Sequence, residues 1–135
     1  MKQRVIVSCL VKKDDAYLFI KQGKQDGAFK GTYHIPGGGI DVGEDLEAAV
    51  RREVLEETGV EIDNLKTASF DSAIVDNYKN DTYQLIFLQF TADYVRGEPI
   101  AGDDAAEVVW LNREEITNSQ QNVATMRFMN KLGLI

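Results

Sequence analysis

The chain has 135 residues, with 22 Asp and Glu against 15 Lys and Arg, so its formal net charge is −7. At this length we expect a single domain over residues 1–135, because single domains cluster at roughly 100–150 residues. With 44% apolar and 27% charged residues, the composition is that of a globular protein. An acidic chain lacks the clustered Lys and Arg that grip a polynucleotide backbone, so no polynucleotide partner is expected. A phosphate-bearing partner would need a cation in between.

The single cysteine, Cys9, lies in an apolar run and is predicted to be a core residue. One thiol forms no internal disulfide, which favours the reducing cytoplasm as the compartment. The apolar run near the N-terminus is short and soon meets charged residues, which does not fit a signal peptide. No stretch approaches the roughly 18 apolar residues of a membrane span, so no membrane partner is expected.

The first half of the chain predicts two strands, loops and a helix. Runs of β-branched and aromatic residues favour strands over 4–11 and 16–22, followed by a glycine-spotted loop over 23–31. A short extended piece over 32–35 leads to Pro36–Gly39, which is predicted to be loop because proline and glycine do not suit a helix interior. A helix is predicted from about residue 45 to 58, with Gly59 as its C-terminal stop.

The second half predicts three more strands, over 65–75, 82–94 and 107–111, with a turn over 76–81 between the first two. A closing helix is predicted over 122–131, with Asn122 as its N-cap. Strands that flank a central helix and a terminal helix indicate the α+β class, with a mixed sheet between helices.

Three glutamates of the central helix, Glu53, Glu56 and Glu57, fall within a sector about 100° wide. The same sector carries apolar residues one to two turns earlier, namely Leu46, Ala49 and Val50. Like charges at these spacings repel, so a cation should compensate them. Arg52 lies beside Glu56 and can hold one carboxylate by a paired hydrogen bond, but it cannot neutralise three. A hard divalent ion such as Mg²⁺ is the natural complement. A solvated, glutamate-rich surface helix is the alternative interpretation.

The segment Pro36–Gly39 precedes this helix by a few residues. Glycine lets the backbone approach a ligand closely, so the loop and the acidic helix converge on one place. A tight turn with no ligand is the alternative for the loop taken alone.

The spacing from Gly38 to Val60 resembles the complete Nudix box, G-x5-E-x7-R-E-U-x-E-E-x-G-U, in which U is a bulky aliphatic residue. Gly38, Glu44 and the run from Arg52 to Val60 fill every fixed position. The resemblance implies an α/β/α sandwich around a mixed sheet. It also implies hydrolysis of a nucleoside diphosphate linked to another moiety, with Mg²⁺ or Mn²⁺ as cofactor.

The resemblance also implies roles for individual residues. Glu53, Glu56 and Glu57 would bind metal, together with a backbone carbonyl near Gly37 or Gly38. Glu44 would support the loop or bind metal through water, Arg52 would orient Glu56, and Glu53 is our choice for the general base. Family members recruit different bases, so an extra base or ligand is sought among Glu98, Asp103, Asp104 and Glu107. An ordinary acidic loop explains these four residues equally well.

Beyond the box, the chain is similar from end to end to bacterial nucleoside triphosphatases that act on pyrimidine deoxynucleoside triphosphates. The expected reaction releases a nucleoside monophosphate and pyrophosphate. Alternatives are a hydrolase for ADP-ribose, nucleoside diphosphate sugars or oxidised nucleotides such as 8-oxo-dGTP, and a non-catalytic nucleotide-sensing module. Substrate contacts are sought at Arg4, Lys21, Tyr33 and Gly37. Solvent exposure of the two cations and core packing of the tyrosine are the alternatives, and both a monomer and a homodimer stay open.

Overall fold

The computed structural model describes residues 1–22, 32–101 and 105–135, so the loop predicted over 23–31 lies outside the described residues. The elements follow in this order: β1 (Lys2–Lys13), β2 (Ala16–Gln22), β3 (Tyr33–His34), β4 (Gly37–Gly39), α1 (Leu46–Thr58), β5 (Glu61–Tyr78), β6 (Asp81–Arg96), β7 (Ala105–Asn112), α2 (Arg113–Asn118) and α3 (Val123–Lys131). In the described part of the chain, no helix has the length and apolar character needed to span a bilayer.

All the strands join one seven-stranded sheet, whose main path runs β3-β2-β1-β6-β5. β7 extends the sheet from β2, and β4 pairs with β1. β1 and β6 run parallel, and the other strand pairs are antiparallel, so the sheet is mixed as predicted. β1 therefore has β6 along one edge, and β4 and then β2 along the other.

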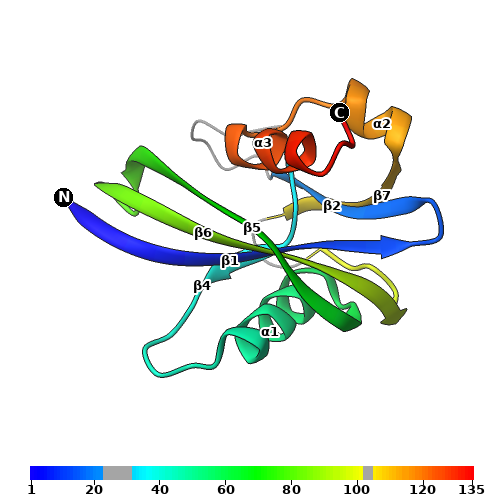
Figure 1. Ribbon diagram of the computed structural model, residues 1–135, viewed down its shortest axis with the longest axis horizontal. Helices are drawn as coiled ribbons and strands as arrows, with labels where there is room; N and C mark the ends of the chain where they lie inside the picture. The colour runs from blue at the N-terminus through cyan, green and yellow to red at the C-terminus, as the bar shows by residue number, and fades with distance from the viewer. Residues whose placement is uncertain (23–31, 102–104) are drawn as a thin grey trace.

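The helices cover both faces of the sheet, with α1 on one side and α2 and α3 on the other (Figure 1). Each side has its own apolar core. One core packs Val50 and Val54 of α1 against the sheet, and the other packs Phe128 and Met129 of α3. Cys9 is fully buried in the first core, where burial raises the pKa of its thiol to about 12, so its predicted place in the core is confirmed.

Capping fixes the two ends of α1. The side chain of Asp45 accepts a hydrogen bond from the N–H of Ala48, which satisfies one of the free donors of the first turn. Gly59 adopts a left-handed conformation, with φ of 75°, and its N–H donates to Leu55 O. The predicted helix is confirmed, although Leu46, which we placed on its buried face, is 38% exposed.

Two other expectations are corrected, and one helix was missed. Gly37–Gly39 is a strand and not a loop, because without side chains its backbone comes close enough to pair with Ser8, Val7 and Ile6 of β1. The turn predicted over 76–81 is confined to Lys79 and Asn80, since β5 and β6 pair along their full lengths. The helix α2 was not predicted, although Asn112 and Glu115 give it a capping box.

Candidate active site

Arg52 lies among three carboxylates at and before α1. Its Nε and Nη2 donate a paired hydrogen bond to Glu44, at 2.7 and 2.9 Å. Its Nη1 donates to Glu53 at 2.9 Å and to Glu56 at 3.2 Å. A paired bond to one carboxylate is thus present, whereas Glu56 receives only a single bond. The paired bond goes to Glu44 because the segment before α1 folds back beside the helix and presents that carboxylate edge-on.

Glu44 ties this segment to the helix. Besides the paired bond from Arg52, its Oε1 accepts the N–H of Asp41 at 3.1 Å. These donors stabilise the ionised form, and the hydrogen bond from Arg52 has the largest effect, so the pKa of Glu44 falls to about 2. The pair is therefore charged at neutral pH and fixes how Arg52 is oriented toward its other partners.

Glu53 points from α1 to the middle of β4. Its carboxylate lies directly over Gly38, where any Cβ would overlap it. The side chain is 14% exposed, and this burial raises its pKa against the opposing effect of the Arg52 hydrogen bond. Glycine at position 38 is thus required by the close approach of a carboxylate to the strand.

Glu57 lies one helical turn further along the same face. Its Oε1 accepts the backbone N–H of Gly37 at 2.7 Å. Burial raises its pKa to about 8, although the Gly37 hydrogen bond opposes the shift, and the charges of Glu53 and Glu56 raise it further. The two carboxylates that face β4 are therefore both poorly stabilised as anions.

The carboxylates of Glu53, Glu56 and Glu57 suit a hard divalent cation chemically, although their oxygens do not converge on one point in this structure. Within residues 1–22, 32–101 and 105–135, no three acidic, histidine or cysteine side chains form a group that could hold a metal ion. Glu56 turns outward and is 58% exposed. Glu53 and Glu57 still offer carboxylate oxygens beside the β4 backbone, and Arg52 reaches only the first of them. A divalent cation would compensate the charge of the Glu57 carboxylate, and the Glu56 side chain could rotate toward that cation.

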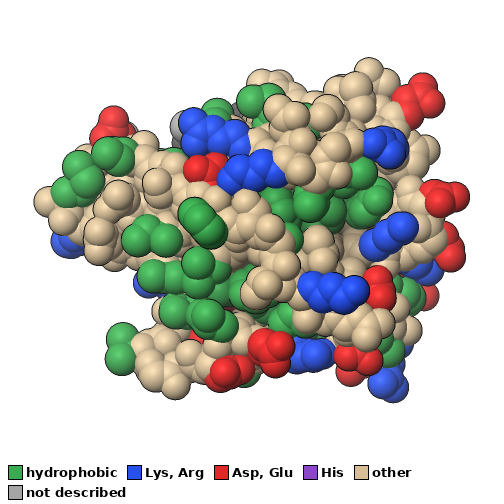
Figure 2. Space-filling view, viewed as in Figure 1, with side chains coloured by type: hydrophobic (Ala, Val, Ile, Leu, Met, Phe, Trp, Pro, Cys, Tyr) green, Lys and Arg blue, Asp and Glu red, His purple; other side chains and the backbone are tan. Residues whose placement is uncertain are grey.

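A cavity of about 710 Å³ lies on the opposite face of the sheet, beneath α3. Its walls include Gly37 and Gly38 of β4, Leu85 and Phe87 of β6, and the first turn of α3 at Asn122. Figure 2 shows apolar side chains over β5 and β6 in the space between the helical layers, with acidic side chains below them along α1. The volume falls within the roughly 300–1,000 Å³ of small-molecule pockets.

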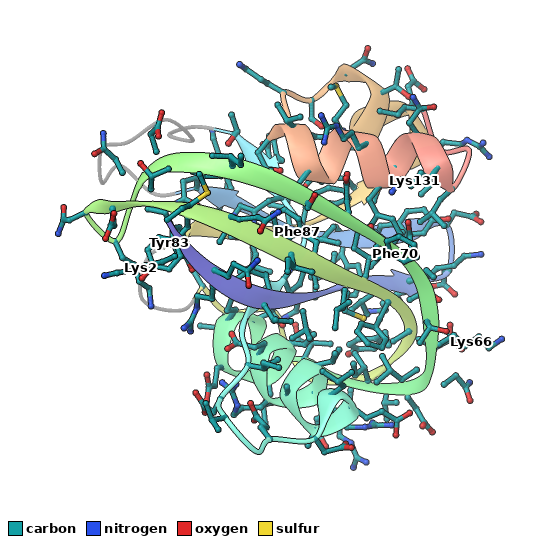
Figure 3. All side chains as sticks on the ribbon, turned by 60° about the vertical axis from the view of Figure 1, so that its left-hand side comes forward. Lys2, Lys66, Phe70, Tyr83, Phe87 and Lys131 are labelled. Carbon is teal, nitrogen blue, oxygen red and sulfur yellow. The ribbon has the colours of Figure 1, made fainter. Side chains whose placement is uncertain are left out.

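Polar contacts tie α3 to β5 beside this cavity. Figure 3 shows Lys131 reaching from the end of α3 toward Phe70, whose backbone oxygen accepts a hydrogen bond from Nζ at 2.8 Å. Arg127 of α3 lies 3.5 Å from Asp71 of β5. These contacts hold the second half of α3 against β5.

The candidate substrate cations lie in different surroundings. The guanidinium of Arg4 lies against Gly39, and its buried Nε has no hydrogen-bond partner in the described part of the chain. Lys21 lies 4.0 Å from Glu107 and over the ring of Tyr33, at 5.9 Å from the ring centre. Arg4 is thus next to β4 with unmet bonding capacity, whereas Lys21 already has an anionic partner.

The four acids sought as extra bases are only partly placed. Glu98 is exposed, and its segment meets the end of α1, where Ile100 donates its N–H to Thr58 O at 2.9 Å. Glu107 pairs with Lys21 on the neighbouring strand β2. Asp103 and Asp104 lie outside the described residues.

Sequence reasoning missed the cavity residues on β6. Leu85, Phe87 and Gln89 alternate along the strand on the face toward α3, and Gln89 is only 3% exposed. The available signal was Gln89, which continues the alternation of apolar residues along the strand. An uncharged polar residue at a buried strand position needs a hydrogen-bond partner.

The comparisons with known proteins agree with this geometry. A model of the family described as NUDIX domain matches residues 2–130. Nucleoside triphosphatase NudI of Escherichia coli K12 is 31% identical over 146 aligned positions that cover all of both chains.

Two solved structures share the fold. The MutT NUDIX hydrolase from Burkholderia pseudomallei superposes with a TM-score of 0.82 at 21% identity, covering 98% of this chain and 99% of that one. A bifunctional NMN adenylyltransferase/ADP ribose pyrophosphatase from Francisella tularensis, complexed with AMP and a Mn ion, superposes with a TM-score of 0.69 at 22% identity, over 96% of this chain and 41% of that one. With its complete motif, its fold and this match over nearly its whole length, the chain belongs to the NUDIX domain family of hydrolases.

Proposed function

We propose that the protein hydrolyses nucleoside triphosphates to a nucleoside monophosphate and pyrophosphate with a divalent metal, Mg²⁺ or Mn²⁺. The observation that carries the proposal is the pair Glu53 and Glu57, held against a strand that also borders a cavity of about 710 Å³. NUDIX hydrolases generally need a divalent metal, and the relative from Escherichia coli is named a nucleoside triphosphatase. Both facts support a metal-dependent reaction on a triphosphate.

The metal would be held by Glu53, Glu56 and Glu57, with a backbone oxygen of Gly37 or Gly38 as a further ligand. When bound, it would neutralise charge on the phosphate oxygens and lower the pKa of a coordinated water. Glu44 would keep Arg52 in place through the paired hydrogen bond. Arg52 in turn would hold Glu53 in the orientation that the reaction needs.

We assign the general base to Glu53. Its carboxylate is largely buried, and burial raises its pKa, which makes it a better proton acceptor than an exposed glutamate. It would take a proton from the attacking water while the Arg52 guanidinium, 2.9 Å away, fixes the carboxylate. Glu98, Asp103, Asp104 and Glu107 stay as further candidates for the base or for an additional ligand.

The substrate would span both faces of the sheet around β4. The Arg4 guanidinium, next to Gly39, would bind a phosphate group, since its buried Nε has no hydrogen-bond partner in the described residues. The nucleoside would enter the cavity beneath α3, beside Gly37. Lys21 and Tyr33 are second candidates for substrate contacts, because Lys21 would first have to leave Glu107.

We also propose that residues 1–135 form a single domain, which is supported by the one continuous sheet and by the family match over residues 2–130. A cytoplasmic location is proposed on the ground of the lone buried thiol, Cys9. The proposal leaves a homodimer to be tested by light scattering.

The test is hydrolysis of a substrate panel by the purified chain with Mg²⁺ or Mn²⁺. The panel contains purine and pyrimidine triphosphates, 8-oxo-dGTP, ADP-ribose and nucleoside diphosphate sugars. We expect pyrophosphate release from triphosphates, and a loss of about 10²–10⁴-fold in turnover for Glu53→Gln. Absence of metal-dependent product from every triphosphate would overturn the proposal, and product from ADP-ribose or the sugars alone would replace it with the corresponding hydrolase.

A further inference from the structure

The cavity beneath α3 extends across the sheet from β4 to β5. Gly37 and Gly38 of β4 border one end, and Ala73 and Val75 of β5 border the other. β1 and β6 lie between these two strands in the sheet. Neighbouring strands are about 4.8 Å apart, so the three steps from β4 to β5 cover roughly 14 Å. The cavity therefore has one end beside the proposed phosphate site and one end far from it.

The wall at the β5 end is apolar on the face toward α3. Asp71 of β5 meets Arg127 of α3, so Ala73 and Val75, two and four residues further along the strand, face the same way. Ala73 is opposite Leu85 of β6, which is only 6% exposed. Ala73 and Val75 are half-buried and border the cavity. The side chain of Ala73 is a single methyl group, which leaves space above the strand at this point.

Polar side chains near this end are occupied within the protein or are out of reach. Arg127 is paired with β5, and Asp76 accepts a hydrogen bond from the Oγ1 of Thr82 at 3.0 Å. The Oε1 of Gln89 has no hydrogen-bond partner among the described residues, but it is buried within the wall and inaccessible to a ligand. A polar group against this wall would lose water without gaining a partner from these side chains, whereas an alkyl group would gain by burial.

The direction of the cavity sets which part of a nucleotide reaches β5. With the phosphates held at β4, as proposed above, the sugar and base would extend over Ile6 of β1 and Phe87 of β6, which both border the cavity. These two residues are register partners and form one apolar surface under a ring. In an extended nucleotide, the exocyclic group at position 4 of a pyrimidine or position 6 of a purine is the part of the base farthest from the 5′-phosphate. This group would therefore lie against Ala73 and Val75.

We propose that Ala73 and Val75 form a subsite for an alkyl group on the exocyclic nitrogen of the base. The inference rests on the function proposed above and names its substrate class, the triphosphates of N4-alkylated cytosine and N6-alkylated adenine. The alkyl group replaces an N–H that the apolar wall does not bond, so it removes a desolvation cost and adds buried area. The reaction is unchanged, because water splits the same phosphoanhydride bond and pyrophosphate is released.

The experiment compares each base with its methylated form, dATP with N6-methyl-dATP and dCTP with N4-methyl-dCTP. With the wild-type chain and Mg²⁺, we expect kcat/KM to be about 4- to 10-fold higher for the methylated member of at least one pair. Ala73→Leu should fill the space and bring this ratio to one or below, while kcat/KM for the unmethylated triphosphates stays close to the wild-type value. Ala68→Leu is the matched control and should keep the ratio, since Ala68 is exposed on the same strand and does not border the cavity.

A second variant, Val75→Thr, tests the apolar character of the subsite with little change in volume. Threonine has nearly the shape of valine but presents a hydroxyl group, so the preference for the methylated member should fall several-fold. This variant decides the question if Ala73→Leu does not fold. A wild-type ratio in Val75→Thr would overturn the proposed subsite.

A binding measurement separates this inference from the proposed function. Calorimetric titration of the 135-residue chain with dAMP, N6-methyl-dAMP, dCMP and N4-methyl-dCMP reports the preference without turnover. Tighter binding of the methylated member with no hydrolysis of any triphosphate would overturn the function and keep the subsite. Hydrolysis with equal or reversed preference within both pairs would overturn the subsite, as would an unchanged ratio in Ala73→Leu.

Discussion

The two faces of β4 differ sharply in chemistry, although the strand is only three residues long. On the side of α1, Gly38 is covered by the Glu53 carboxylate, and Glu57 bonds to the backbone of Gly37. On the side of α3, the same strand borders a cavity whose walls are mainly aliphatic and aromatic. Successive residues of a strand point to opposite faces, so one residue step separates the acidic site from the apolar one. Under the proposed function, phosphate chemistry and base recognition would therefore be carried by different layers of the molecule.

The largest effect that tests this separation is expected from Glu57→Gln. The amide keeps the size of the side chain but removes a proposed metal ligand, so turnover with Mg²⁺ should fall by about 10²–10⁴-fold while affinity for a nucleoside monophosphate stays nearly constant. Steady-state kinetics and calorimetry measure the two quantities. Glu47→Gln, on the exposed first turn of α1, is the control and should change neither. Unchanged turnover in Glu57→Gln would remove Glu57 from the metal site.

Two adjacent glycines allow a sharper comparison. A Cβ at Gly38 would overlap the Glu53 carboxylate, whereas a Cβ at Gly39 would overlap the Arg4 guanidinium. We expect Gly38→Ala to weaken Mn²⁺ binding about tenfold or more, measured by electron paramagnetic resonance. Gly39→Ala should leave Mn²⁺ affinity unchanged and raise KM for the triphosphate. Equal loss of Mn²⁺ affinity in both variants would contradict the division of roles between the two faces.

The pH dependence of stability tests the acidic side alone. Burial raises the pKa of Glu57 from 4.5 to about 8, so between these values the folded chain holds a proton that the unfolded chain has released. The free energy of unfolding without metal should therefore fall as pH rises through this window. Glutamine does not titrate, so the stability of Glu57→Gln should lack this pH dependence. The free energies of unfolding of the wild-type chain and of Glu57→Gln should therefore differ by about 1–3 kcal/mol more at pH 8.5 than at pH 4.5. Urea unfolding in the presence of a chelator measures both free energies. If they change with pH in parallel, Glu57 is not buried as a protonated acid.

The smallest effect is expected from a change that touches neither face of β4. Asn112 caps α2 by accepting the N–H of Glu115 at 2.8 Å, and Asn112→Ala should lower stability by about 1 kcal/mol. Turnover and Mn²⁺ affinity should stay at the wild-type values when they are measured well below the melting temperature. A loss of either would mean that α2 is coupled to the site, which the present geometry does not suggest.

Local signals account for the elements that sequence reasoning predicted correctly. Asp45 and Gly59 fix the ends of α1 through bonds to residues three or four positions away, so a short window of sequence contains the necessary information. The strand character of β4 could not be found in this way, because Gly37–Gly39 has no side chains to give a pattern. It becomes a strand only because β1 offers pairing partners about thirty positions earlier in the chain, from Ile6 to Ser8.

The candidate site likewise has features that local sequence predicts and features that depend on distant parts of the chain. The spacing of Glu53, Arg52, Glu56 and Glu57 identified the acidic helix, because residues three and four apart share a helix face. The spacing did not show that Arg52 forms its paired bond with Glu44, or that Glu56 turns outward, since both depend on how the preceding segment folds back. Nor did it reveal the cavity, whose walls come from the strands β1 to β6 and from α3.

The acidic sequence by itself determined the family, the central helix and the set of carboxylates, because each is encoded by residue types at short, regular spacings. Only the tertiary structure decided which carboxylates meet β4 and that Gln89 is buried with a free acceptor beside an apolar cavity. The physical reason is that burial and desolvation arise when distant strands and helices pack together. These effects set the pKa of Glu57 and the unmet bond of Gln89, and no local stretch of sequence contains them.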